Sequence, residues 1–120
     1  ASGYTNSTSG PAVWKGGIAL GSGQSFISGN GMNALVMQGD GNLVLLRQGV
    51  AQWSSGTYNH PGAFAVMQMD GNLVVYSSTG TPLWYSGTSG YPGGATYVQD
   101  DGNVVIYTQV PNWSTNTAGG

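Results

Sequence analysis

The chain has 120 residues, the usual size of one domain, so we expect a single domain spanning residues 1–120. It carries two basic and four acidic residues. Two positive charges cannot neutralise a row of phosphates, which argues against nucleic acid as a partner. No apolar run approaches the roughly 20 residues that cross a bilayer, so we expect no membrane insertion. The lack of cysteine excludes disulfides and thiolate-bound metals.

The first part of the chain predicts an arm followed by short strands. Residues 1–12 are small and polar and show no periodicity, which predicts a flexible or loosely docked arm. We expect residues 13–30 to supply further strands that complete the first sheet. Glycine accounts for 22 residues, and no segment keeps an apolar period of 3.6 residues long enough for a helix. The predicted fold class is therefore all-β.

Three similar units follow, because two kinds of residue recur about every 30 positions. These are the glutamines Gln38, Gln68 and Gln99 and the tryptophans Trp53, Trp84 and Trp113. Tryptophan at an equivalent position of every repeat is typical of a core, so we expect these three side chains to pack inside the molecule. Each unit ends in a related phrase, WSSGT, WYSGT or WSTNT. Its fourth residue is Gly or Asn, which tolerate left-handed backbone angles.

Each unit also contains a hairpin signal, which is clearest in the segment QMDGNLVVY that begins at Gln68. Asp-Gly within alternating residues predicts a three-residue loop that pairs Gln68 with Asn72. The same register pairs Val66 with Val74. Polar and apolar residues then lie on opposite faces of the hairpin.

The inward face of the three hairpins is predicted to build the core. Its residues are Met37, Leu43, Leu45, Met67, Leu73, Val75, Val98, Val104 and Ile106. All nine are apolar, whereas a register shifted by one residue would bury amides and expose these side chains.

The outward face combines groups that suit a neutral, hydroxylated ligand. Amides donate and accept hydrogen bonds, a carboxylate accepts hydroxyl hydrogens, and valine covers C–H groups. The complete candidate sites are Gln68, Asp70, Asn72, Val74 and Tyr76, and Gln99, Asp101, Asn103, Val105 and Tyr107. The first unit has Gln38, Asp40, Asn42 and Val44. Leu46 stands where the other units have tyrosine, so we expect this site to be weaker.

Other roles for these residues remain open alternatives. The outward residues could serve only to form the turns. Asp100 and Asp101 could suggest acid and base catalysis, but strand neighbours point apart, so we expect no catalytic residues and no enzyme. His60 is alone beside Pro61, which predicts a loop residue, and we expect no metal site and no cofactor.

The alternation of Gln, Asp, Asn, Val and Tyr resembles the sugar-binding motif of the monocot mannose-binding lectins, the bulb-type family, over roughly residues 13 to 117. The resemblance implies the β-prism II fold, with three four-stranded antiparallel sheets around a pseudo-threefold axis and the repeated tryptophans at its centre. It implies that the polar residues hydrogen-bond mannose while valine packs on the ring carbons. The expected partners are mannose or mannose-rich glycans.

The same resemblance implies a homodimer formed by exchange of the C-terminal strand around Trp113 to Thr117. Plant members commonly carry a disulfide, which this chain cannot form. We expect a secreted or extracellular protein, with the cytoplasm as the alternative. A lectin-like bacteriocin or another protein-binding member of the same fold is the alternative function, and a β-trefoil lectin is the alternative fold.

Overall fold

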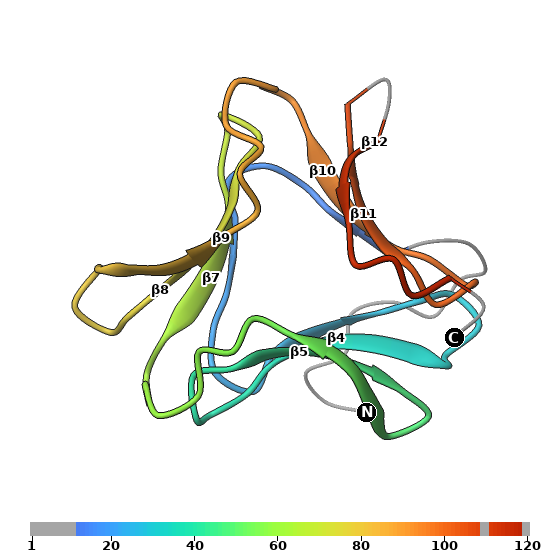
Figure 1. Cartoon of the computed structure of the whole chain (residues 1–120), viewed down its shortest axis with the longest axis horizontal. Helices are drawn as coiled ribbons and strands as arrows, with labels where there is room; N and C mark the ends of the chain where they lie inside the picture. Colours follow the sequence, from blue (N-terminus) through green and yellow to red (C-terminus); the bar gives the residue numbers. More distant parts are fainter. Residues whose placement is uncertain (1–11, 109–110, 119–120) are drawn as a thin grey trace.

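The computed structural model describes residues 12–108 and 111–118. In this part of the chain the regular structure consists of strands, which form three four-stranded antiparallel sheets arranged as the sides of a triangle (Figure 1). The all-β prediction is therefore confirmed. The predicted arm at residues 1–12 lies outside the described residues except for Ala12, which begins the first strand. Among the described residues, no helix is long and apolar enough to span a membrane.

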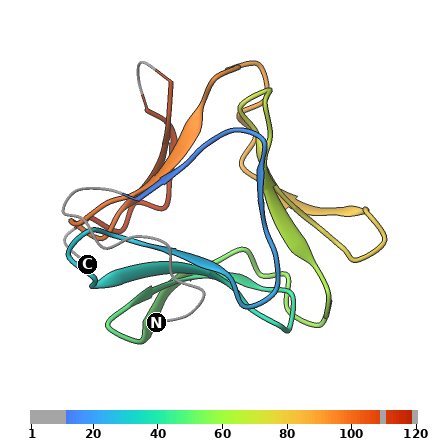
Figure 2. The ribbon, with the colours of Figure 1, turned by 180° about the vertical axis from the view of Figure 1, so that it is seen from behind.

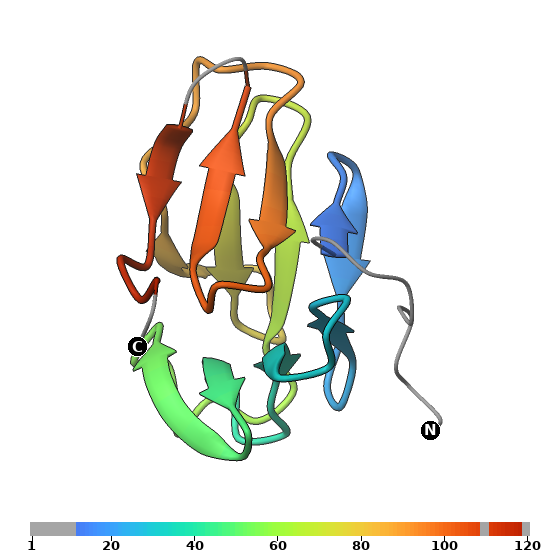
Figure 3. The ribbon, with the colours of Figure 1, turned by 90° about the vertical axis from the view of Figure 1, so that its right-hand side faces the viewer.

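Each sheet contains one hairpin unit plus one strand from the beginning of the chain. The first sheet has the order β3 (Ser25–Ile27), β4 (Asn33–Met37), β5 (Leu43–Arg47) and β6 (Val50–Ser54). The second has the order β2 (Ile18–Leu20), β7 (Phe64–Met67), β8 (Leu73–Tyr76) and β9 (Pro82–Tyr85). The third has the order β1 (Ala12–Trp14), β10 (Ala95–Val98), β11 (Val104–Tyr107) and β12 (Pro111–Ser114), and Figure 3 shows its last three strands side by side.

The N-terminal segment joins all three sheets, and the prediction that it completes the first sheet alone was wrong. β1 pairs with β10, β2 with β7 and β3 with β4. Figure 2 shows this blue segment passing along the sheets in turn. Each of these strands has only three residues. One short strand covers the open edge of each sheet, which satisfies backbone groups that an exposed edge would leave unpaired.

The core contains the inward residues that the hairpin register predicts. All nine are at most 1% exposed. Trp14 joins them from β1 and is completely buried. Its ring stacks on Phe26 at a centroid distance of 5.3 Å, and its Nε1 donates a hydrogen bond of 2.8 Å to the carbonyl of Ile18. The N-terminal segment therefore adds apolar packing as well as edge pairing.

The repeated tryptophans are half-buried and pack against the core, which confirms that they face inward. The ring centroids of Trp53, Trp84 and Trp113 lie 5.2 to 5.5 Å apart in all three pairs. Their planes cross at 70 to 73°, an edge-to-face geometry that aromatic rings favour. Because each sheet contributes one ring and each ring contacts the other two, the tryptophans surround the pseudo-threefold axis.

Candidate functional site

The predicted hairpin is present in the second sheet. The amide of Gln68 donates to the carbonyl of Asn72 at 2.9 Å, and the amide of Gly71 donates to the carbonyl of Gln68 at 3.1 Å. Gly71 has the left-handed angle that the loop requires, with φ of 93°. Val66 pairs with Val74, so the predicted register is confirmed. We call the outward surfaces of the β4–β5, β7–β8 and β10–β11 hairpins the first, second and third faces.

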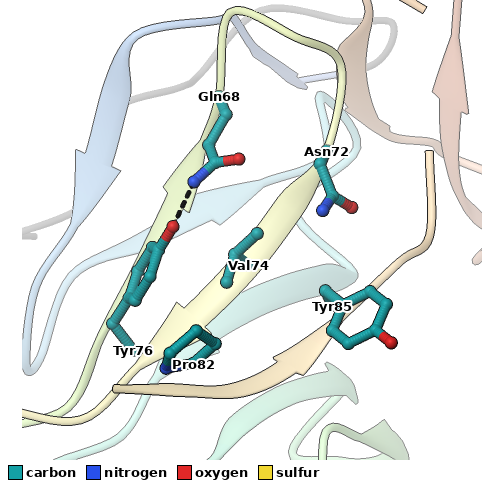
Figure 4. A pocket seen from close by; sticks show the side chains of 6 residues that line it. All are labelled: Gln68, Asn72, Val74, Tyr76, Pro82 and Tyr85. Carbon is teal, nitrogen blue, oxygen red and sulfur yellow. Dashed lines mark hydrogen bonds between the residues drawn. The ribbon is translucent and has the colours of Figure 1, made fainter. Parts of the chain in front are cut away.

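The second face is hollowed into an open cavity of about 230 Å³. The residues that line it are Gln68, Asn72, Val74, Tyr76, Pro82 and Tyr85. In Figure 4, Val74 lies at the middle, with Gln68 and Tyr76 on one side and Tyr85 on the other. Four of the five residues predicted for this site therefore meet in one hollow, and their amides and hydroxyl surround an apolar floor.

The glutamine and tyrosine of the site hold each other in place. Gln68 Nε2 donates a hydrogen bond to the hydroxyl oxygen of Tyr76, drawn as a dashed line in Figure 4. Gln99 Nε2 donates in the same way to the hydroxyl oxygen of Tyr107, at 3.1 Å. This contact leaves the amide oxygen as an acceptor and the tyrosine O–H as a donor. Groups fixed before a ligand arrives lose less conformational freedom on binding.

The aspartates lie in the hairpin loops, and each uses one oxygen to fix its turn. Oδ1 of Asp70 accepts from the amide of Asn72 at 2.9 Å, and Asp101 and Asp40 repeat the contact with the asparagine two residues on. This is the turn-forming role that aspartate performs in many loops. Asp70 is exposed and does not line the cavity of the second face. Among the described residues its Oδ2 makes no hydrogen bond.

The asparagines serve the fold through one end of their amide. Oδ1 of Asn72 accepts hydrogen bonds from Ser86 Oγ at 3.1 Å, from the amide of Gly87 at 3.0 Å and from the amide of Thr88 at 3.2 Å. Asn42 and Asn103 accept from the equivalent residues of their own units. The repeated phrase after each tryptophan is thereby fastened to its hairpin. Nδ2 is the end of the amide that remains to meet a ligand.

The third face has the same arrangement on a different aromatic support. Tyr107 meets Tyr97 edge to face at 5.3 Å, whereas Tyr76 stacks on Phe64 at 5.7 Å. The neighbouring Asp100 points to another partner, because its Oδ1 accepts from the amide of Asn30 at 2.9 Å. Among the described residues, no group of three or more His, Cys, Asp or Glu side chains could hold a metal ion.

The first face keeps the hairpin but changes the surface below it. Gln38 donates from its amide to the carbonyl of Asn42 at 2.9 Å, as in the other units. Further along the face lies an apolar hollow of about 260 Å³. It is lined by Ile27, Gly31, Met32, Ala34, Val36, Leu46, Gln48 and Gly49. Leu46 cannot give Gln38 the hydroxyl acceptor that tyrosine provides, so this glutamine lacks that contact.

The hairpin turns are packed against loops of neighbouring units. A Cβ added to Gly41 would lie 2.2 Å from the carbonyl oxygen of His60, and one added to Gly71 would lie 2.2 Å from that of Tyr91. His60 belongs to a loop, as predicted, and its amide donates to the carbonyl of Asp40 at 3.0 Å. These contacts fix the turns relative to the rest of the prism.

Sequence reasoning missed three residues near the faces. Arg47 belongs to the first sheet, yet its Nη1 lies 3.5 Å from the carbonyl oxygen of Asp101 in the third hairpin. Pro82 and Tyr85 come from β9 and line the second face. Tyr85 directly follows the inward Trp84, so strict alternation along the strand was the signal that could have found it. Pro82 depends on a register shift between Val75 and Tyr76, which no local pattern announces.

A threefold prism of short strands with neutral, amide-lined faces has the features of a carbohydrate-binding protein. Comparison with solved structures supports this class. The chain is 37% identical to monomeric monocot mannose-binding lectins from Gastrodia elata, with a TM-score of 0.79 over 89% of this chain and 98% of that one. It is 36% identical to the mannose-specific agglutinin of snowdrop, Galanthus nivalis, solved with methyl α-D-mannoside, with a TM-score of 0.76 over 91% and 99%.

A lectin from Japanese Marasmius oreades is also similar, with 29% identity and a TM-score of 0.82 over 95% of this chain and 96% of that one. No model of a known protein family matches the sequence, and no curated protein matches it. The identity to the Gastrodia elata and snowdrop lectins, over nearly their whole length, decides the assignment. The chain belongs to the monocot, bulb-type mannose-binding lectin family and has its β-prism II fold.

Proposed function

We propose that the chain binds mannose-containing glycans without catalysis, through the second and third faces. The observation that carries the proposal is the convergence of Gln68, Asn72, Val74 and Tyr76 on one hollow, with the glutamine and tyrosine already hydrogen-bonded to each other. The likeness to the snowdrop agglutinin, which was solved with methyl α-D-mannoside, supports the same conclusion. Asp70 and Asp101 would accept ligand hydroxyls through Oδ2 from the adjoining loops.

The strength of a single site is limited by its shallowness. A protein–ligand hydrogen bond contributes about 0.5 to 1.5 kcal/mol after exchange with water. A few such bonds and one valine contact give a Kd of about 1 mM, which corresponds to a binding free energy of roughly −4 kcal/mol. One chain has two complete sites, and self-association would increase the number of sites per particle. Several linked sites raise the avidity for a branched glycan. We therefore propose that the protein is multivalent.

The test removes one acceptor from each competent site and keeps the turn. Asp70→Asn combined with Asp101→Asn retains an Oδ1 acceptor for the loop amide and replaces Oδ2 by a donor. A hydrogen bond to a charged group contributes about 1.5 to 3 kcal/mol, so the affinity for methyl α-D-mannoside should fall more than about tenfold. Titration calorimetry measures the affinity, and circular dichroism reports whether the fold is kept.

The matched control is Asp100→Asn, which changes the neighbouring carboxylate that accepts from Asn30 instead. It should leave mannoside binding as it is in the parent chain. If the double variant released as much heat as the parent chain, the proposed sites would be wrong. A glycan array without mannose signal, together with growth inhibition or receptor binding, would instead favour a bacteriocin-like or protein-binding role. Secretion stays a prediction that signal-sequence mapping on the full gene product would test.

We also propose a homodimer formed by exchange of the C-terminal strand. In the single chain, β12 is an edge strand of the third sheet, where Trp113 pairs with Ile106 and its ring contacts Trp53 and Trp84. A partner's β12 could make the same contacts. The similar lectins from Gastrodia elata are monomeric. The molecular mass in solution therefore decides whether this chain is a monomer or a dimer. Light scattering should give twice the chain mass, and truncation after Val110 should abolish the dimer; a monomer mass for the full chain would contradict exchange.

A further inference from the structure

The second face has one aromatic side chain that its two counterparts lack. Tyr85 lies on β9, directly across from Val74, and 63% of its surface is exposed. The residues that face the equivalent valines are Ser54 in the first sheet and Ser114 in the third. A single exposed aromatic residue needs no explanation by itself. Tyr85 differs because it lines the cavity that holds the candidate site.

The shape of the cavity gives this ring a definite place. Figure 4 shows Gln68 and Tyr76 on one side of Val74 and the ring of Tyr85 on the other, with its hydroxyl directed away from Val74. Pro82 closes the end of the hollow between the two tyrosines. Within the described part of the chain, the Tyr85 side chain makes no hydrogen bond and no ring contact. Its apolar surface is therefore available to a ligand.

The two sides of the cavity offer different chemistry. The side of Gln68 and Tyr76 presents an amide oxygen and a hydroxyl proton, which suit the hydroxyl groups of a hexose. The side of Tyr85 presents an aromatic ring, whose electron-rich face attracts the C–H groups that are exposed on one side of a pyranose. One hexose that hydrogen-bonds to Gln68 and covers Val74 leaves the Tyr85 ring for the sugar linked to it.

We propose that Tyr85, together with Pro82, forms a second subsite that receives the adjacent residue of a neutral oligosaccharide. The inference rests on the proposed function, because it requires a terminal mannose at Gln68, Asn72 and Tyr76. The second face then prefers a disaccharide or longer chain over a single sugar. The third face, where Ser114 takes the place of Tyr85, does not distinguish the two to the same degree.

The experiment compares two ligands, an α-linked mannobiose and methyl α-D-mannoside, and reports the ratio of their affinities by calorimetry. An Asp101→Asn background weakens the third face, so the measured ratio belongs to the second. Tyr85→Ser installs the residue of the other two sheets. An aromatic contact is worth about 0.5 to 1.5 kcal/mol, so the ratio should fall about 2- to 12-fold. Tyr85→Phe keeps the ring and should restore the ratio.

A reciprocal variant tests the subsite by a gain of preference for the disaccharide instead of a loss. Ser114→Tyr in an Asp70→Asn background should raise the same ratio at the third face. An unchanged ratio in Tyr85→Ser, or the same reduced ratio in Tyr85→Phe, overturns the subsite while mannoside binding by the parent chain upholds the proposed function. If the parent chain binds neither sugar, the proposed function fails and the subsite fails with it.

Discussion

The first and second faces share a hairpin and differ in what lies below it. Both have a three-residue loop with a left-handed glycine and an aspartate that accepts from the asparagine amide. Below the loop, Phe64 and Tyr76 form a stacked pair on the second face. Ala34 and Leu46 pair at the same place on the first face, where the smaller side chains leave an apolar hollow.

The comparison separates residues that build the turn from residues that prepare a site. The Asp-Gly-Asn sequence occurs in both units because the loop, the Asx contact and the amide network require it. The tyrosine is present in the second unit and absent from the first, and its hydroxyl fixes the orientation of Gln68. A polar loop is therefore evidence for the turn, and the tyrosine at the far end of the strand is the evidence for a binding site.

The largest expected effect is the loss of a turn glycine, which should damage both faces equally. Gly41→Ala and Gly71→Ala each force alanine into a left-handed angle and place Cβ 2.2 Å from a backbone oxygen. The left-handed angle costs about 1 to 2 kcal/mol, and overpacking adds about 1 to 3 kcal/mol. Urea denaturation should show a loss of about 2 to 5 kcal/mol in the free energy of unfolding.

Two other glycines provide matched controls for the contact term. Gly49 and Gly80 also have left-handed angles, of 84° and 91°, but a Cβ there would meet nothing within 4 Å. In their alanine variants, the free energy of unfolding should fall only by the about 1 to 2 kcal/mol that the left-handed angle costs. Equal losses for Gly80→Ala and Gly71→Ala would show that the packing of the turn against Tyr91 contributes nothing.

Removal of the asparagine acceptor should also act on both faces. Asn72→Ala leaves the amides of Gly87 and Thr88 without their acceptor, and Asn42→Ala does the same to the amide of Thr57. An unsatisfied, partly buried donor costs about 1 to 3 kcal/mol. Thermal unfolding should show that loss in either variant, while Asn72→Asp should keep most of the stability because Oδ1 remains. A fully stable Asn42→Ala would contradict the turn-building role of the first loop.

Removal of the tyrosine hydroxyl should make the second face resemble the first. Tyr76→Phe keeps the ring that stacks on Phe64 and removes the acceptor of Gln68 Nε2. The affinity for methyl α-D-mannoside should fall about 2- to 12-fold, which corresponds to about 0.5 to 1.5 kcal/mol, in an Asp101→Asn background. Tyr58→Phe changes an exposed loop tyrosine and serves as the control. Unchanged affinity in Tyr76→Phe would show that the glutamine needs no partner.

The sequence predicts what local patterns determine. The Asp-Gly dipeptide fixes the loop, and the period of two then fixes which side of each hairpin enters the core, so Gln68, Asn72 and the nine inward residues lie as expected. The recurrence of the tryptophans predicts that they pack inside the molecule, whereas their meeting at the axis is what the family resemblance implies. The inferences from the hairpin loop and its register need only neighbours in the same unit, which is why they succeed.

Contacts between distant segments are what the sequence does not predict. The three strands at the start of the chain have three residues each, too few to show which sheet they join. The approach of Arg47 to the third hairpin joins two units that are far apart in the chain. Pro82 faces Tyr76 only because the strand register shifts between Val75 and Tyr76. The residues that each hairpin contributes to its face were therefore predictable. The residues that β9 adds to the second face were not.

The smallest expected effect is a gain at the first face. Ala34→Phe with Leu46→Tyr rebuilds the aromatic pair of the second face, fills part of the apolar hollow and gives Gln38 a hydroxyl acceptor. Filling a partly open hollow should stabilise the fold by about 0.5 kcal/mol. Calorimetry with methyl α-D-mannoside should then show an additional weak binding equivalent. The control, Ala34→Phe with Leu46→Phe, fills the same hollow without adding a hydroxyl. It should be stabilised to the same degree and should not bind the mannoside at the first face. Binding by both variants would show that the aromatic ring, and not the hydrogen bond to Gln38, prepares the face.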